Sequence, residues 1–484
     1  MSSPVPLGSR VSGRRLALLL GEWRRRGSRQ GAANLAAAVE LHVLDGRLPI
    51  GTRLPAEREL ADALGVSRTL IGAALDRLRA DGLVASRRGA GSWISGTGHR
   101  AHEPVRRERD GVIDLARAAP AALPGLLAAV DAARRDLVDH VDGNGYFTGG
   151  LPRLRERIAE RYTARGLPTT PEEVMVTSGA YSAFVLCLRM LAGPGDRVLV
   201  EQPTYPNAID AVRAAHALPV PVALDPVHGW DLPGIEAAVR QASPRFAYVV
   251  ADFQNPTGLR LDAAGRSQLG GLLARSRTPV VVDESLVELD FEGDPVDGPP
   301  PLAAFAGDSA LTVGSAAKSQ WGGLRLGWIR ASAELLDRLL SSRFAVDLGA
   351  PVFDQLVLAR LLEPAGYVEL GRRRAEIREQ RDTLVELVRS YCPEWTFEVP
   401  GGGLSLWCRL PEPMSTRLAV AAAGHGVQLA PGSRFGVDGG LERWMRVPFG
   451  LPKEELGEAM RRVSSAVAAV TGGRGAGVVD VPVT

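Results

Sequence analysis

Short runs of aliphatic and β-branched residues alternate with helical stretches over most of the chain after residue 112. The runs that predict strands are Val174–Thr177, Arg197–Val200, Phe246–Ala251, Pro279–Asp283 and Ala310–Val313. The stretches that predict helices are Tyr181–Leu191, Tyr205–Ala215, Leu232–Gln241 and Asp262–Arg275. This alternation predicts an α/β domain with a mainly parallel sheet, because neighbouring parallel strands need a crossover connection that is usually a helix. Ligands of such sheets bind at the carboxyl ends of the strands.

A lysine in an arginine-rich chain follows the last of these strands. Of the 57 basic residues, only Lys318 and Lys453 are lysines. Lys318 lies in a predicted loop of small residues and is followed by no other charge before Arg325. Arginine stays protonated in proteins, whereas a desolvated lysine can lose its proton and attack a carbonyl carbon to form a Schiff base. Lys318 is therefore a candidate nucleophile, against the alternative of an ordinary surface lysine.

Four further strand ends carry groups with binding chemistry. Ser178-Gly179-Ala180 opens a helix, whose first N–H groups and dipole favour a phosphate. Asp283 ends an apolar strand and needs a partner there, because a buried unpaired carboxylate is strongly destabilising. Asn255, in a Pro-Thr-Gly turn, and Tyr205 follow two other strands. An amine, a carboxylate, an amide, an aromatic face and a phosphate cradle together predict a site for pyridoxal phosphate.

The first part of the chain has a different charge balance. Residues 1–112 hold 19 Arg, no Lys and 11 Asp plus Glu, which leaves a net charge of +8. The remaining residues hold 38 basic and 44 acidic side chains, a net charge of −6. A basic N-terminal part on an acidic body predicts a polyanion as the partner of that part. A disordered arginine-rich leader accounts for some of this charge, since five of the arginines occur within residues 14–26.

The same part carries a helix-turn-helix pattern. Apolar residues recur at helical spacing between Ala33 and Leu44. A second helix is predicted at Glu57–Leu64, where Gly65 ends it. Ser67 then caps a third helix, which begins at Arg68. Two short helices joined by a glycine-containing turn are typical of DNA-binding domains, and side chains in the first turn of the second one reach base edges.

Two predicted strands, Leu83–Ser86 and Ser92–Ser95, follow this helix and flank a basic turn that suits phosphates. The segment Asn34–Ser95 resembles the winged helix of the GntR regulators. The resemblance rests on Leu54-Pro55, Arg58-Glu59-Leu60-Ala61, Leu64-Gly65-Val66-Ser67-Arg68-Thr69, Leu78-Arg79-Ala80-Asp81-Gly82-Leu83 and Arg87-Arg88-Gly89. It implies DNA binding through Arg53, Arg58, Ser67, Arg68, Thr69, Arg87 and Arg88. A protein–protein module is the alternative for a winged helix.

The body of the chain resembles the fold-type I, or aspartate aminotransferase-like, pyridoxal phosphate proteins. The resemblance implies that Lys318 forms the Schiff base, that Asp283 holds the ring nitrogen protonated and that Asn255 donates to the ring hydroxyl. It implies that Tyr205 stacks on the ring and that Arg446 clamps a substrate carboxylate. The implied phosphate site consists of Ser178, Gly179, Ala180, Ser315 and Arg325, with Tyr146 reaching the phosphate of a partner subunit.

One position departs from that family. Its members usually carry a tyrosine two or three residues after the aspartate, as a donor to the ring hydroxyl, but this chain has Ser285 and Leu286 there. A buried donor of this kind contributes about 1–3 kcal/mol. We therefore expect cofactor binding to survive and efficient transamination to suffer.

The two halves together resemble the MocR/GabR-type transcription regulators. The implied fold is multidomain: a winged helix-turn-helix of the α+β type, then an α/β fold-type I domain with a small C-terminal α+β subdomain. The expected segments are a disordered or loosely helical leader at 1–30, the winged helix at 31–96, a linker at 97–112, the cofactor domain at 113–472 and a tail at 473–484. The implied function is that of a cytoplasmic, dimeric, DNA-binding regulator. It would sense pyridoxal phosphate, or an amine or amino acid that forms an external aldimine with it.

Other functions fit parts of the pattern. A working pyridoxal phosphate-dependent aminotransferase with a DNA-binding domain attached is the main alternative, so the sequence leaves open whether the chain is an enzyme. A Ser-x-x-Lys acyl enzyme would also need a Lys-Thr-Gly strand, yet Lys453 is followed by Glu454. The three cysteines lack metal-ligand spacing and fit a reducing compartment. We expect neither a signal peptide nor a membrane span, because no apolar run is long enough.

Overall fold

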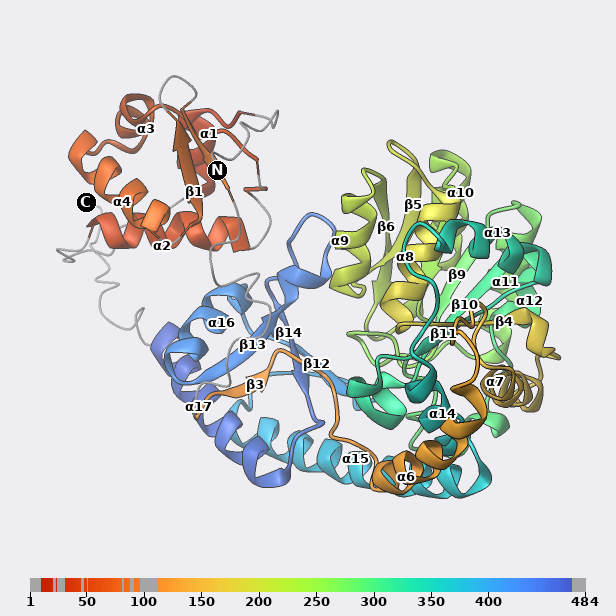
Figure 1. The fold of residues 1–484 in the computed structure, drawn as a ribbon. Helices are drawn as coiled ribbons and strands as arrows, with labels where there is room; N and C mark the ends of the chain where they lie inside the picture. The colour runs from red at the N-terminus through yellow and green to blue at the C-terminus, as the bar shows by residue number, and fades with distance from the viewer. Residues whose placement is uncertain are drawn as a thin grey trace.

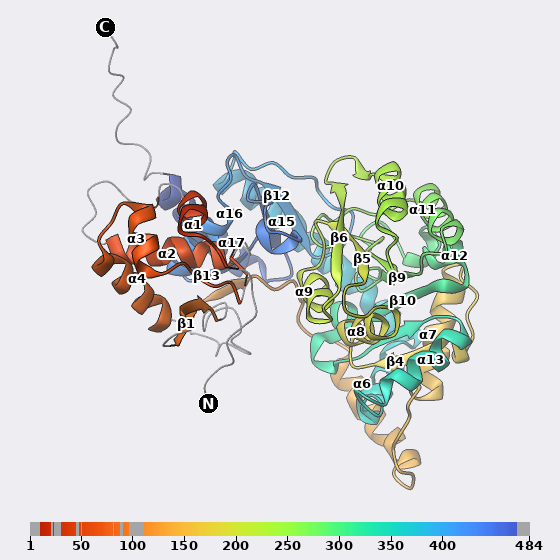
Figure 2. The same cartoon turned by 90° about the horizontal axis from the view of Figure 1, so that it is seen from above.

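The computed structural model describes residues 10–20, 23, 31–44, 48–49, 51–80, 82–87, 91–95 and 111–471. These residues form an N-terminal domain, a large domain on an eight-stranded sheet and a small domain on a four-stranded sheet (Figure 1). The small domain lies between the other two in both views (Figures 1 and 2). Within the described ranges, no helix has the length and apolar character needed to cross a membrane. The expected tail from residue 473, Arg88 and most of the expected linker lie outside the described residues.

The N-terminal domain packs helices against a two-stranded hairpin. Its elements are α1 (Gly13–Leu20), α2 (Gly31–Leu44), α3 (Glu57–Leu64), α4 (Arg68–Ala80), β1 (Val84–Arg87) and β2 (Gly91–Ile94). Gly65 ends α3 in the left-handed conformation, at φ 63°. The Ser67 hydroxyl accepts a hydrogen bond from the Leu70 N–H at the start of α4. The predicted turn and cap between these two helices are therefore confirmed.

The leader, which the sequence predicts to be disordered or loosely helical, contains a helix, α1, that packs into the core of the domain. Leu16 and Leu20 of α1 are buried in the same apolar cluster as Leu60 of α3. The Arg10 guanidinium donates to one Glu59 oxygen at 2.6 Å, and the Gly13 N–H donates to the other at 2.8 Å. The partner of α1 lies in α3, too far along the chain for a local pattern to reveal it.

The large sheet has the strand order β4-β11-β10-β9-β8-β5-β6-β7. Its strands are β4 (Val174–Thr177), β5 (Arg197–Gln202), β6 (Leu218–Asp225), β7 (Gly229–Trp230), β8 (Phe246–Val249), β9 (Val280–Asp283), β10 (Ala310–Ser315) and β11 (Gly327–Arg330). The central strands pair in parallel, whereas β11 is antiparallel to both β10 and β4, and β7 is antiparallel to β6. The five predicted strands and the mainly parallel sheet are confirmed.

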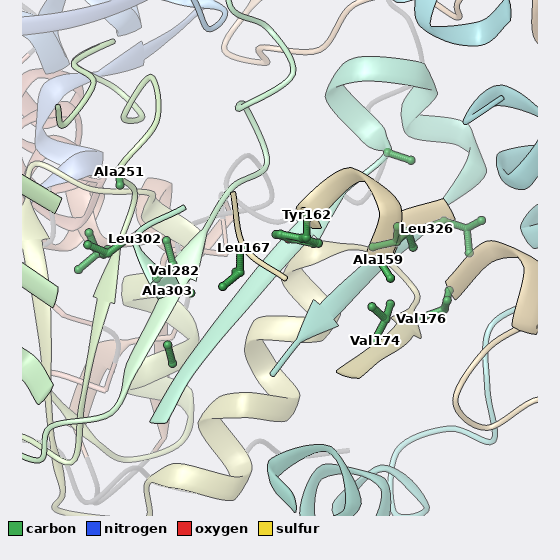
Figure 3. Close-up of a cluster of buried hydrophobic side chains, with 14 of the residues drawn as sticks. Ala159, Tyr162, Leu167, Val174, Val176, Ala251, Val282, Leu302, Ala303 and Leu326 are labelled. Atoms are coloured by element: carbon green, nitrogen blue, oxygen red, sulfur yellow. The ribbon is translucent and has the colours of Figure 1, made fainter. Parts of the chain in front are cut away.

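Helices cover both faces of this sheet, so its central strands are apolar on both sides. Val280 and Val282 belong to one core cluster and Val281 to the other, as the alternation of side chains along a strand requires. Figure 3 shows part of the first cluster, where Val282 and Tyr162 are among the labelled side chains. The helices of this domain are α6 (Leu126–Asp136), α7 (Pro152–Ala164), α8 (Ala180–Leu191), α9 (Pro206–Ala214), α10 (Leu232–Ala242), α11 (Ala263–Arg275), α12 (Ala303–Ala306), α13 (Ala333–Arg343) and α14 (Val352–Leu361).

The small domain is built on the strand order β12-β14-β13-β3. Its elements are β3 (Ile113–Leu115), β12 (Ser405–Arg409), β13 (Val427–Pro431), β14 (Trp444–Pro448), α15 (Pro364–Tyr391), α16 (Ser415–Gly424) and α17 (Lys453–Thr471). β3 is the first strand after the N-terminal domain and pairs in parallel with β13. The small sheet therefore joins residues 113–115 to the C-terminal part of the chain. The residues that follow β3 leave directly from this sheet.

Candidate cofactor cavity and DNA-binding face

A cavity of about 770 Å³ lies between the large sheet and the small domain. Its volume is in the range of pockets that hold a cofactor or a small ligand. The predicted residues that line it are Gly179, Ala180, Tyr205, Asn255, Asp283, Ser315, Lys318, Arg325 and Arg446. All of them except Arg446 come from turns or strand ends of the large domain. The structure thus brings these residues together where the rule for parallel sheets places a ligand.

Lys318 lies in a π-helical turn, Ala317–Trp321, rather than in the predicted loop. Its Nζ donates a hydrogen bond of 2.7 Å to the carbonyl of Ala118. Burial, and to a smaller degree the charge of Arg446, lower the pKa of Lys318 from 10.5 to about 8. The neutral amine is therefore far more populated at neutral pH than in a surface lysine, and only the neutral amine is nucleophilic.

Asp283 has the partner that its position at the end of a buried strand requires. The hydroxyl of Tyr248, on the adjacent strand β8, donates to Asp283 Oδ2 at 2.7 Å. The Ser285 N–H donates to Oδ1 at 2.9 Å. Burial raises the pKa of Tyr248 well above 10, so its hydroxyl remains a donor. The sequence reasoning missed Tyr248, although a tyrosine within an apolar strand signals a hydroxyl that needs a buried partner.

Arg446 and Asn255 form the side of the cavity between the two domains. The side chain of Arg446 on β14 is only 7% exposed. Its Nη1 donates to Asn255 Oδ1 at 3.3 Å, and its Nη2 donates to the carbonyl of Ala116. Its Nε has no hydrogen-bond partner among the described residues, and burial lowers its pKa to about 10. A buried guanidinium with an unused N–H favours an anionic ligand, because an unsatisfied buried donor is destabilising.

The turn between β4 and α8 forms another wall of the cavity. Gly179 has φ 106°, and a Cβ there would lie 3.3 Å from Arg325 Nη2. Arg325 Nη2 donates to the carbonyl of Ser178 at 3.4 Å, so Ser178 takes part through its backbone rather than as a lining residue. The Ser315 hydroxyl accepts from the Ala317 N–H at 3.1 Å. The N-terminus of the 12-residue helix α8 lies at this wall and favours a phosphate.

The remaining aromatic residues differ in their relation to the cavity. Tyr205 lines it, and burial raises the pKa of its hydroxyl to about 12. Tyr146 is 64% exposed and does not line the cavity of its own chain. Ser285 and Leu286 line the cavity after Asp283. The positions where a tyrosine was expected from the resemblance therefore face the cavity without a phenol.

The described side chains fit pyridoxal phosphate. The paired carboxylate of Asp283 suits a protonated ring nitrogen, the amine of Lys318 suits the aldehyde, and the α8 N-terminus with Arg325 suits the phosphate. The unused Nε of Arg446 suits a carboxylate of a second ligand. When bound, the cofactor would supply an electrophilic carbonyl and an electron-withdrawing ring.

The N-terminal domain presents a separate basic face. Arg68 and Thr69, in the first turn of α4, are exposed, as are Ser67 and Arg58. Arg87 is exposed at the end of β1. Arg53 differs, because it is partly buried between Arg10 and Trp93, with which it forms β-bridges. The exposed members of the predicted set thus lie on α3, on the turn before α4, on α4 and on the hairpin, whereas Arg53 bridges to Trp93 of β2.

The chain belongs to the aminotransferase class I and II family, whose model matches residues 111–463. This family depends on pyridoxal phosphate, so the body of the chain is a pyridoxal phosphate-binding domain. The model for bacterial regulatory proteins of the gntR family matches residues 32–94, which form a DNA-binding domain. Taken together, the two domains are those of a DNA-binding regulator of the MocR type.

Three similar proteins illustrate the relatives of this chain: two are aminotransferases and one is a transcription regulator. The 2-aminoadipate transaminase of Thermus thermophilus is 31% identical over 66% of this chain and 80% of that protein. The crystal structure of alpha-aminoadipate aminotransferase from Thermus thermophilus, complexed with N-(5'-phosphopyridoxyl)-L-leucine, has a TM-score of 0.69 and 29% identity, and covers 75% of this chain and 94% of that one. The probable rhizopine catabolism regulatory protein MocR of Rhizobium meliloti is 29% identical over 81% of this chain and 84% of that protein.

Proposed function

We propose that this regulator acts in the cytoplasm as a sensor of pyridoxal phosphate, or of an amine or amino acid that reacts with the bound cofactor. The observation that carries the proposal is that Lys318, whose pKa is lowered, lies in a cavity. The same chain also carries a GntR domain. In this proposal Asp283 holds the ring nitrogen, Asn255 and Tyr205 contact the ring, and Arg446 binds a ligand carboxylate. The phosphate is bound by Arg325, Ser315 and the turn Ser178-Gly179-Ala180.

The segment after β3 offers a route from the cavity to the DNA-binding domain. Lys318 donates to the carbonyl of Ala118, and Arg446 donates to the carbonyl of Ala116. A ligand that takes over these two donors releases both carbonyls. The segment continues through β3 into residues 111–112 and the expected linker, so its release changes the restraint on the DNA-binding domain. Ligand binding then shifts the population of two domain arrangements.

A test uses the only two lysines as a matched pair. The full-length chain is mixed with pyridoxal phosphate, and the visible absorbance of the cofactor bound to a lysine is recorded. We expect Lys318→Ala to remove this band and Lys453→Ala to retain it, because Lys453 is on the surface, paired with Glu379. Binding of promoter DNA with and without cofactor is measured on the same samples. A wild-type protein that gains no band and no cofactor-dependent change in DNA binding would contradict the proposal.

A working aminotransferase is the second candidate, because Lys318, Asp283 and Arg446 are all in the cavity. Leu286 counts against it, since it supplies no phenol for the ring hydroxyl. The two functions differ in turnover: a sensor converts at most the cofactor that it carries, whereas an enzyme sustains keto-acid release. Single-turnover and multiple-turnover assays with a panel of amino acids separate them.

We also propose a homodimer in which Tyr146 reaches the cavity of the partner. Large apolar side chains are exposed next to Tyr146, namely Val138 and Val141, and again after α13, at Phe344 and Val346. Exposed apolar patches of this kind are typical of interaction sites. A second copy of the chain would cover the patch and bring Tyr146 to a phosphate site.

A further inference from the structure

The cavity carries more positive charge than the cofactor and one carboxylate would use. Its charged lining residues are Arg117, Arg325, Arg434, Arg446, Lys318, Glu40 and Asp283. In the proposed function, the cofactor uses Lys318, Arg325 and Asp283, and one carboxylate of the ligand uses Arg446. Two guanidinium groups, Arg117 and Arg434, remain without a role. Glu40, from α2 of the DNA-binding domain, is the only other lining anion among the described residues.

Among the described residues, the guanidinium groups of Arg117 and Arg434 each have one long, exposed ion-pair partner, and the Arg434 contact is also a hydrogen bond. Arg434 Nη2 lies 3.4 Å from Asp210 Oδ2, with side chains that are 45% and 50% exposed. Arg117 Nε lies 3.5 Å from Asp114 Oδ2, with side chains that are 72% and 35% exposed. Pairs as long and as exposed as these contribute little to stability, because solvent screens the charges. A ligand anion can therefore replace either aspartate at small cost.

Both arginines lie next to groups that contact Arg446. Arg434 precedes Phe435, whose ring centroid is 5.1 Å from the Arg446 guanidinium carbon. Arg117 follows Ala116, whose carbonyl accepts from Arg446 Nη2. They reach the cavity from two elements, the turn Gly432–Phe435 and the segment after β3. Arg117 and Arg434 thus line the same cavity as Arg446, and a ligand bound at Arg446 shares that cavity with two further cationic groups.

We propose that the effector is an α-amino acid with a second anionic group on its side chain, bound by Arg434 and Arg117. This inference rests on the proposed function, because it assigns the α-amino group to the cofactor and the α-carboxylate to Arg446. Charge-assisted hydrogen bonds to guanidinium groups supply both the affinity and the selection against neutral amino acids. Carboxylates and sulfonates share the required chemistry.

The test compares isosteric ligands on the full-length chain loaded with pyridoxal phosphate. L-glutamate, L-glutamine and L-homocysteate are titrated while the cofactor absorbance and the heat of binding are recorded. We expect L-glutamate to bind at least about tenfold more tightly than L-glutamine. The double variant Arg117→Gln/Arg434→Gln should reduce this ratio to within about threefold, while keeping the cofactor band. Arg417→Gln is the matched control, because Arg417 is exposed on α16 and does not line the cavity.

The outcomes separate this inference from the function on which it rests. A wild-type protein with a normal cofactor band that binds L-glutamate and L-glutamine equally would overturn the inference and leave the cofactor function standing. So would a double variant that keeps the full preference for L-glutamate. A wild-type protein that gains no cofactor band would instead remove the proposed function itself. Equal binding of L-homocysteate and L-glutamate would support a general anion site, and weaker binding of L-homocysteate would support a carboxylate site.

Discussion

The bond between Tyr248 and Asp283 links the core of the large domain to the cavity. The Tyr248 side chain is buried, which raises the pKa of its hydroxyl, and this hydroxyl donates to the Asp283 carboxylate. The bond holds the Asp283 carboxylate in the orientation in which it lines the cavity. Tyr248 is therefore a positioning residue, which acts on the cofactor through Asp283.

We predict that Tyr248→Phe weakens the binding of pyridoxal phosphate. The substitution removes one donor from a partly buried carboxylate, which costs about 1–3 kcal/mol. Equilibrium titration of the cofactor, followed by its absorbance, measures the change. Tyr391→Phe is the control, since Tyr391 is 38% exposed at the end of α15. Equal cofactor affinity in Tyr248→Phe and the wild type would show that Asp283 does not need this donor.

The pKa of Lys318 sets the pH at which the cofactor attaches. Because the pKa is lowered to about 8, the neutral amine accumulates at lower pH than in a free lysine. We predict that the rate of attachment rises about tenfold per pH unit below pH 8 and levels off above it. Rapid mixing at pH 6 to 9, with absorbance detection, measures the profile. A rate that is still rising at pH 9 would mean that burial does not lower the pKa of the amine.

At the scale of elements, α1 is the part of the N-terminal domain where structure and sequence expectation differ most. The helix has one buried face and one exposed face: Leu16 is fully buried, whereas Leu18 is 77% exposed. Glu59 of α3 binds both the Arg10 side chain and the Gly13 N–H at the start of this helix. α1 therefore braces α3, the first helix of the helix-turn-helix.

We predict that Leu16→Ala destabilises the DNA-binding domain by about 2–5 kcal/mol, because it leaves a cavity in the core. Leu18→Ala, on the same helix, should change the free energy of unfolding by less than about 0.5 kcal/mol. Urea unfolding, followed by circular dichroism and by DNA binding, measures both variants. If the two variants unfold alike, α1 is the loose leader that its sequence alone predicts.

In the molecule as a whole, a hydrogen bond joins two segments that are distant in sequence and that each carry exposed apolar side chains. The Arg343 Nη1 donates to the carbonyl of Thr148 at 2.7 Å and ties the end of α13 to the segment after Tyr146. Phe344, directly after α13, is 61% exposed. The hydrogen bond between Arg343 and Thr148 therefore holds the segment after Tyr146 next to the end of α13, which precedes Phe344.

We predict that Phe344→Asp raises the dissociation constant of the dimer more than about tenfold, because burying an unpaired carboxylate is strongly unfavourable. Sedimentation at several protein concentrations measures the constant. Val227→Asp is the control, since Val227 is 64% exposed in the turn between β6 and β7. A dimer that is unchanged by Phe344→Asp would place the interface elsewhere.

Local sequence patterns account for the features that depend on neighbours along the chain. The α4 boundaries, the Ser67 cap, the central strands and the chemistry at their ends all follow from local spacing and side-chain type. The candidate role of Lys318 also comes from the sequence, because lysine is rare in this arginine-rich chain. These signals are local because caps, turns and periodicity involve residues only a few positions apart.

The contacts between groups that are distant in sequence depend on how the whole chain packs. Tyr248 reaches Asp283 because β8 and β9 are neighbours in the sheet, and the carbonyls of Ala116 and Ala118 meet Arg446 and Lys318 because β3 joins the small domain. The burial of Lys318 and the packing of α1 on α3 arise in the same way. Burial and long-range hydrogen bonds depend on the packing of the whole chain, and therefore no local pattern contains them.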